Sequence, residues 1–145
     1  MVDIVKELKD IAETLNYKFD YGTRAMLNLI KSKDTDDDIY FMLSAPITWS
    51  NEASEYGIGN STASGNFLLL KRSKFGGVVY RSKNQDEDKT KYNKNIVPLF
   101  TEVDNIKSAL LCGTLQIKAW SAVEGYDIFD GNFDGLIITF SLYQR

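Results

Sequence analysis

The sequence predicts an α+β fold, in which a mostly antiparallel sheet is packed by two helices. Two segments, one near the N-terminus and one between positions 92 and 112, carry apolar residues at helical spacing. Several other segments are β-prone, and some alternate apolar and polar side chains as half-buried strands do. The chain has 145 residues, of which 43% are hydrophobic and 26% charged. We therefore expect residues 1–145 to form a single domain with its own core.

The first helix is predicted over residues 3–15. Its apolar face consists of Ile4, Leu8, Ile11 and Leu15. The opposite face is charged, and Asp3 is placed to act as an N-cap for the first backbone N–H groups. We interpret the apolar face as core packing in preference to a surface for a partner.

Short strands are predicted after this helix. Residues 17–22 alternate aromatic and polar side chains, and residues 39–45 are apolar and β-prone. Pro46 follows directly and is expected to end that strand or to place it at a sheet edge. Residues 67–71 form a further strand, which residues 76–80 either continue or pair with.

Three segments lack a firm pattern. Residues 23–31 are compatible with helix or strand, and strand is favoured. Residues 33–38 contain four aspartates, which could gather a cation but are more typical of an exposed acidic loop. Residues 81–91 carry charges of both signs and are predicted to form a surface loop.

Residues 48–66 are rich in Gly, Ser, Asn and Thr and are predicted to form a long loop or an extended hairpin arm. Trp49, Tyr56 and Ile58 are spaced along this arm. Large apolar side chains on such a segment either fold back on their own sheet or pack against another molecule. The two interpretations remain open, and in the second these three residues form part of an oligomer interface.

The second helix is predicted over residues 97–111, with the possibility of one or two further turns before it. Pro98 suits the first helical turn, and Gly113 suits the position after the last turn. Cys112 is the only cysteine, so it cannot form a disulfide within the chain, and we expect it to be packed.

Two β-prone runs close the sequence. In residues 114–124, Leu115, Ile117 and Ala119 alternate with a second set of side chains to which Trp120 also belongs. Residues 136–143 form the second run. We therefore predict a C-terminal hairpin.

The sequence between these two runs, DGNFDG at 130–135, resembles the first half of a calcium-binding loop. Position twelve of such a loop is a glutamate, but Ser141 stands at the corresponding place, and the residues after Gly135 have a strand pattern. We interpret the motif as a turn built from residues that tolerate a left-handed backbone. A weak cation site at Asp130–Asp134 remains the alternative.

Composition narrows the function classes. The chain contains no histidine, which removes the commonest general base and zinc ligand, and we do not expect an enzyme, a catalytic set, a cofactor or a metal centre. The net charge of −3 does not favour a nucleic-acid-binding face. No apolar run is long enough to cross a membrane, and the N-terminus lacks the apolar core of a signal peptide.

The predicted order of elements is similar to that of tail-terminator and connector (neck) ring proteins of tailed bacteriophages. Four features resemble, more specifically, the neck and tail ring proteins of crassvirus-like gut phages. They are the opening amphipathic helix, FDYG at 19–22, IYFML at 39–43 before a proline, and the ending IFDGNFDGLIITFSLYQR at 128–145.

The resemblance implies a structural virion protein that assembles in the host cytoplasm. Its copies would form a homo-oligomeric ring in the neck or tail, between portal and tail, and DNA would pass through the lumen without sequence-specific binding. The sheet edges and the 48–66 arm would contact neighbouring copies and the adjoining portal, neck or tail proteins. Two rival hypotheses are a small ligand- or calcium-binding interaction module and a histidine-free enzyme that uses carboxylates.

Overall fold

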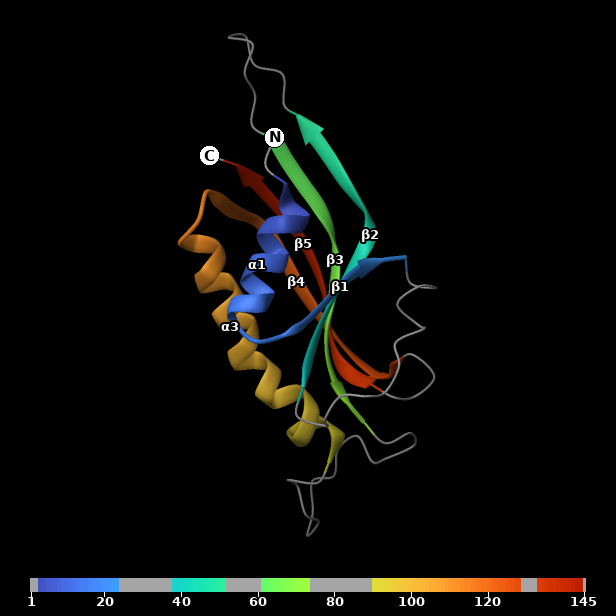
Figure 1. The fold of residues 1–145 in the computed structure, drawn as a ribbon. Helices are drawn as coiled ribbons and strands as arrows, with labels where there is room; N and C mark the ends of the chain where they lie inside the picture. The colour runs from blue at the N-terminus through green and yellow to red at the C-terminus, as the bar shows by residue number, and fades with distance from the viewer. Residues whose placement is uncertain (1–2, 24–37, 52–60, 74–89, 129–132, 145) are drawn as a thin grey trace.

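A computed structural model describes residues 3–23, 38–51, 61–73, 90–128 and 133–144. The elements, in chain order, are α1 (Ile4–Thr14), β1 (Lys18–Gly22), β2 (Ile39–Asn51), β3 (Ser61–Arg72), η2 (Tyr92–Ile96), α3 (Val97–Leu111), β4 (Leu115–Asp127) and β5 (Phe133–Gln144). They form an α+β fold in which the helices lie on one face of a five-stranded sheet (Figure 1). None of the described helices is long and apolar enough to cross a membrane.

Helix α1 begins and ends at local signals in the sequence. The Asp3 carboxylate accepts a hydrogen bond from the Lys6 backbone N–H, which confirms the predicted N-cap. After the helix, Asn16 adopts φ 62°, a left-handed conformation that asparagine tolerates. Backbone bonds from Asn16 to Glu13 and from Tyr17 to Ala12 then complete a Schellman motif, which turns the chain into β1.

Helix α3 has the predicted bounds and places Pro98 in its first turn. The turn of π-helix η2 precedes it directly and adds the further turn that the sequence left open. Cys112 follows the last turn and is exposed, so the prediction that it is packed was wrong. The side chain lies outside the buried face of α3, which consists of Leu99, Val103, Ile106 and Leu110.

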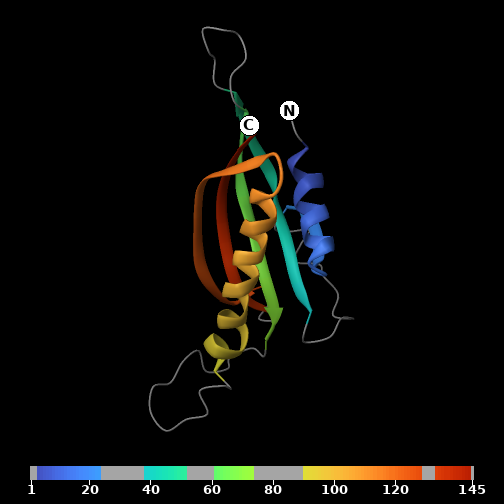
Figure 2. The ribbon, with the colours of Figure 1, turned by 90° about the vertical axis from the view of Figure 1, so that its left-hand side faces the viewer.

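The strands follow the spatial order β1-β2-β3-β5-β4. β1 is parallel to β2, and every other neighbouring pair is antiparallel. The predicted C-terminal hairpin is therefore present as β4 and β5. Figure 2 shows α3 in front of the central strands, with α1 beside it toward β2.

The main core lies between this sheet and the helices. It contains side chains from α1, α3 and the near face of four strands, among them Leu8, Ile106, Phe41, Phe67 and Phe140. Phe41 and Phe67 stack with ring centroids 4.2 Å apart. A second, smaller cluster on the other face consists of Tyr40, Met42, Leu68, Leu70 and Phe133. The apolar face predicted for residues 3–15 is therefore core, as expected.

Strand β2 does not end at Pro46, as one of the two sequence interpretations allowed, but continues to Asn51. The Ala45–Pro46 peptide is cis, and the pairing with β3 shifts between Ser44 and Thr48. β1 pairs with β2 only as far as Ser44. Pro46 therefore lies where β2 itself is the edge of the sheet, so its missing N–H interrupts no described pairing.

Strand β4 contains an irregularity that sequence alternation did not predict. Its register with β5 shifts between Ile117 and Ala119, so Lys118 is an extra residue. The shift exchanges the two faces of the strand from that point on. Trp120 consequently packs against the main core, and its grouping with the outward-facing set was wrong.

Several predictions lie outside the described residues. These are the conformation of 24–31, all but Asp38 of the acidic run, and the strand at 76–80. The segment 81–91 is described only at Thr90 and Lys91, and both residues are buried. The prediction of a surface loop is therefore wrong at its C-terminal end.

Candidate assembly surfaces and a buried polar cluster

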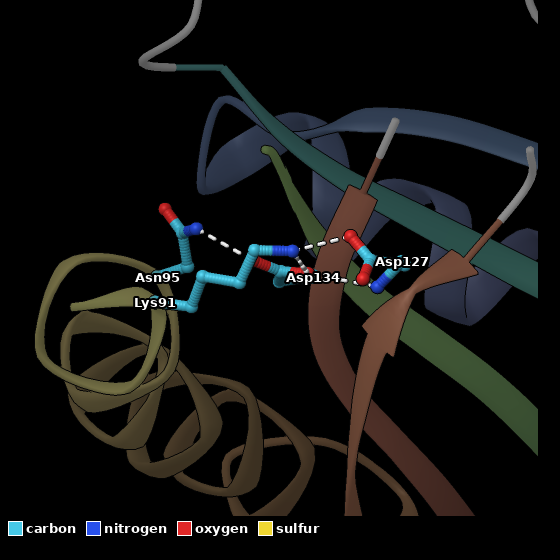
Figure 3. A network of polar contacts seen from close by, with 4 residues as sticks. All are labelled: Lys91, Asn95, Asp127 and Asp134. Carbon is cyan, nitrogen blue, oxygen red and sulfur yellow. Dashed lines mark hydrogen bonds and ion pairs between the residues drawn. The ribbon is translucent and has the colours of Figure 1, made fainter. Parts of the chain in front are cut away.

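A buried polar cluster joins the start of the second helical segment to the C-terminal hairpin (Figure 3). It consists of Lys91, Asn95, Asp127 and Asp134. Asp134, on β5, is 0% exposed, and the Lys91 side chain is 6% exposed. Their ion pair has an Nζ–Oδ1 distance of 3.6 Å, and Lys91 also pairs with the Asp127 carboxylate.

Both oxygens of the Asp134 carboxylate have hydrogen-bond donors. Oδ2 accepts from the Asn95 side chain at 2.8 Å, and Oδ1 accepts from the Asp127 backbone N–H at 2.9 Å. A buried charge is tolerated when it is paired and when its remaining lone pairs are satisfied, and both conditions hold here. The cluster therefore fixes the position of η2 against β4 and β5.

This arrangement bears directly on the DGNFDG motif. Residues 130–132 lie outside the described part, but Asp134 and Gly135 belong to β5, and Ile128 bridges to Phe133 across the hairpin. The Asp134 carboxylate is thus already paired with the Lys91 ammonium group, and a calcium ion would have to displace that group. Within the described ranges, no group of three or more carboxylate or thiol side chains is arranged to hold a metal ion.

Gly135 has a role that the turn interpretation did not predict. A Cβ at this position would lie 2.0 Å from the backbone oxygen of Leu69 on β3. The glycine is therefore required by the close approach of two strands and not by a left-handed backbone. The sequence places Gly135 in a turn-like motif, whereas in the structure its missing side chain allows β5 to approach β3 closely.

The predicted 48–66 arm is a hairpin whose two sides are the end of β2 and the start of β3. The described parts are ordinary strand, with Asn51 opposite Ser61 and a hydrogen bond of 2.7 Å between their side chains. Trp49 is 38% exposed, whereas Ala63 opposite it is buried in the main core. The base of the arm is therefore part of the domain. Tyr56 and Ile58 lie outside the described residues.

The face of the sheet away from the helices is polar toward the arm. Directly paired residues of β3 and β5 form an uncharged row, namely Thr62 with Tyr143, Ser64 with Ser141, and Asn66 with Thr139. Two of these pairs are hydrogen-bonded through their side chains, at 3.1 Å and 2.8 Å. A shallow hollow of about 300 Å³ beside the row is lined by Ser44, Ala45, Asn66, Leu68 and Ile137. No residue of the buried polar cluster lines it.

The two outer strands expose large apolar side chains. On β1, Tyr21 is 38% exposed, and on β4, Val123 is 63% exposed. Ser121, Ala122 and Glu124, beside Val123, are exposed as well. Among the described residues, no strand pairs with the outer side of β1 or of β4. As far as the described residues go, both edges therefore carry backbone groups that another strand could pair with.

Two tyrosines have perturbed acidity. Burial raises the pKa of the Tyr17 hydroxyl far above its usual range, and the hydrogen bond that it donates to the Glu102 carboxylate raises it further. Burial and a hydrogen bond to Glu124 raise the pKa of Tyr126 to about 12. Both hydroxyls are neutral at physiological pH. The hydrogen bond between Tyr17 and Glu102 links the segment after α1 to α3. The hydrogen bond between Tyr126 and Glu124 joins two residues of the edge strand β4.

The sequence interpretation missed the buried cluster because its members are far apart along the chain. Lys91 and Asp127 look like ordinary members of polar segments, and Asp134 looks like part of a turn. The only available signal is that Asp134 lies two residues before the apolar run 136–138, close to the predicted strand 136–143.

Comparison of the chain with protein-family models and with curated protein sequences found no match in either case.

Proposed function

We propose that this protein is a structural subunit of a bacteriophage virion, and that its copies form a homo-oligomeric ring in the neck or tail. The observation that carries the proposal is the pair of sheet edges that no described strand covers, each with an exposed apolar residue. A ring requires two different contact surfaces on each subunit, and the edges lie on opposite sides of one sheet. The fold agrees with the one that the resemblance implies.

The charge and the site chemistry fit this role better than the rival hypotheses. DNA passing through a lumen should meet little attraction, and a net charge of −3 provides none. The buried carboxylate and lysine hold each other and do not face the hollow. A calcium- or ligand-binding module and a carboxylate enzyme therefore have less support, and we propose that the chain is not an enzyme.

In this proposal the 48–66 arm provides a second contact. Trp49 lies on the outer edge of β2, above the end of β1, and remains partly exposed at the base of the arm. An arm that leaves the sheet beside an exposed tryptophan is well placed to reach a neighbouring copy or an adjoining neck protein.

Electron microscopy of the purified full-length chain tests the proposal. We expect annular particles with an open lumen, in addition to unassembled subunits. The matched variant replaces residues 52–60 with Asn-Gly, which suits a tight turn between Asn51 and Ser61. We expect this variant to keep the thermal transition of the monomer and to form fewer rings. The proposal is contradicted if no annular particle forms at any protein concentration.

A further inference from the structure

The two edges of the sheet have opposite strand directions. β1 runs parallel to β2, and three antiparallel pairings then lead across the sheet to β4. β4 therefore runs opposite to β1. If one copy is placed beside another so that the sheet continues, β4 of the first and β1 of the second form an antiparallel pair, which is the pattern with the better hydrogen-bond geometry.

The register shows which residues of the two edges lie at the same level. One row crosses the whole sheet through Asp20, Met42, Leu68, Ile137 and Val123. By the same pairings, Gly22 is level with Ser121 and Lys18 is level with Gly125. All five residues of β1 thus lie at the same levels of the sheet as residues 121–125 of β4.

The bulge and the proline that would interrupt edge pairing lie outside these five levels. The extra residue Lys118 interrupts β4 before this segment begins. Pro46 and the register shift of β2 lie beyond the end of β1. Bulges and prolines are among the usual protections of an edge strand, and both are missing from Ser121–Gly125 and Lys18–Gly22, where Lys18 is the one lysine.

The exposed apolar residues of the edges lie within the same segments. Tyr21 and Val123 occupy adjacent levels and point to opposite faces of the sheet. Strand pairing between copies would cover both, one on each face. In a monomer both remain in water, which is unfavourable for side chains of this size.

We propose that β4 of one copy pairs with β1 of the next, through Ser121–Gly125 and Lys18–Gly22, so that the sheet continues antiparallel from subunit to subunit. This inference rests on the proposed ring and identifies its principal contact. The partner is a second copy of this chain because the two edges run in opposite directions and the whole of β1 lies level with one segment of β4. Since the edges differ from each other, the contact is head-to-tail and extends to many copies, whereas two identical edges would stop at a dimer.

Disulfide trapping tests the contact. In a Cys112→Ser background, the pair Asp20→Cys with Val123→Cys places one thiol on each edge. Four strand spacings separate these positions within a chain, about 19 Å, which is too far for an internal disulfide. Under mild oxidation we expect a ladder of covalent oligomers on a non-reducing gel. The matched pair Ser50→Cys with Val123→Cys, which moves one thiol to β2 beyond the end of β1, should give no ladder.

A charge substitution provides an independent test in solution. Val123→Glu should raise by about tenfold or more the protein concentration needed for assembly, because it places a carboxylate directly opposite Asp20 of the next copy, and like charges in that position destabilise strand pairing. Leu111→Glu is the matched control, since Leu111 is similarly exposed, at 67%, but lies on α3 away from both edges. It should assemble as the unchanged chain does. Both substituted side chains are exposed, so both variants should keep the thermal transition of the monomer.

The outcomes separate the inference from the proposed function. Rings that form normally with Val123→Glu overturn the edge pairing and leave the ring in place. A ladder from the Ser50 pair in place of the Asp20 pair does the same. Covalent dimers from Asp20→Cys alone or Val123→Cys alone, without a ladder from the double variant, would show that two identical edges pair with each other. This result would also overturn the proposed pairing of β4 with β1. A chain that stays monomeric at every concentration contradicts the proposed function, and the inference falls with it.

Discussion

The buried polar cluster places charged groups inside the subunit, whereas the two sheet edges place large apolar side chains on its surface. Each arrangement is the reverse of the usual one, in which charged groups are exposed and large apolar groups are buried. At the cluster, three charged groups from distant parts of the chain are gathered with Lys91 and Asp134 almost fully buried. At the edges, the large apolar side chains of Tyr21 and Val123 are exposed. The comparison indicates that charge is used inside the subunit to fix its own elements, where every partner comes from the same chain. Large apolar side chains are left exposed on the two outer strands, which no described strand covers.

The largest expected effect comes from breaking the cluster. Asp134→Ala leaves the Lys91 ammonium group buried with only the half-exposed Asp127, and leaves two hydrogen-bond donors without their acceptor. Removing one member of a buried ion pair costs about 3–5 kcal/mol, so we expect the free energy of unfolding to fall by that amount. Urea unfolding followed by circular dichroism measures it. Asp104→Ala, at an exposed position of α3, is the control and should change stability by less than about 0.5 kcal/mol. An equally small effect of Asp134→Ala would contradict the role given to the cluster.

The second prediction tests the strand spacing beside the cluster. Gly135→Ala places a Cβ against the backbone of β3, which cannot yield without separating two central strands. We expect a loss of about 2–3 kcal/mol, typical of overpacking in a core. Gly113→Ala is the control, because its Cβ would make only an ordinary contact, 3.6 Å from the Leu110 oxygen. Equal melting temperatures for the two variants would refute the steric argument.

The third prediction concerns the pH dependence of the contact between α1 and α3. The raised pKa of Tyr17 means that the folded chain keeps this proton after the unfolded chain has lost it. The resulting stability is fully present below about pH 10 and is lost as the pH rises above it, by up to about 1.4 kcal/mol per pH unit. Tyr17→Phe should reduce this alkaline slope and cost about 1 kcal/mol at neutral pH, through the lost hydrogen bond to Glu102. Unfolding measured from pH 8 to pH 11 reveals both effects, and an unchanged slope would show that another group is responsible.

The smallest effect on monomer stability is expected at the base of the arm. Trp49→Ser removes a partly exposed side chain from the outer edge of β2, so the unfolding free energy should fall by about 1 kcal/mol or less. Ring formation should nevertheless weaken if Trp49 meets a neighbour. Sedimentation velocity at several concentrations separates the two properties. A large loss of stability with unchanged assembly would place Trp49 in the core.

Local features of the sequence predicted much of this fold. Both helices, their first-turn residues and the closing hairpin follow from signals within a few residues, such as Asp3 before α1 and Pro98 at the start of α3. The features that could not be predicted depend on the partner strand. Lys118 is an extra residue only relative to β5, and it is this shift that turns Trp120 inward.

The candidate surfaces were predictable only in part. The arm and Trp49 stand out by composition, whereas the exposure of Val123 depends on β4 being the last strand of the sheet. The buried Asp134 was hidden inside a motif that resembles a calcium loop. A deletion of residues 50–64, which composition alone suggests as dispensable, would remove the core residue Ala63. Replacement of 52–60 is therefore the better variant.

The mass of the full-length chain in solution, measured by light scattering over a range of concentrations with and without calcium, tests the central claim most directly. We predict that the mass rises with concentration toward a defined ring of several copies, and that calcium changes neither this rise nor the melting temperature. A monomer at every concentration would contradict the claim, and if calcium also stabilised that monomer, the DGNFDG segment would be a binding site and the ring would be abandoned.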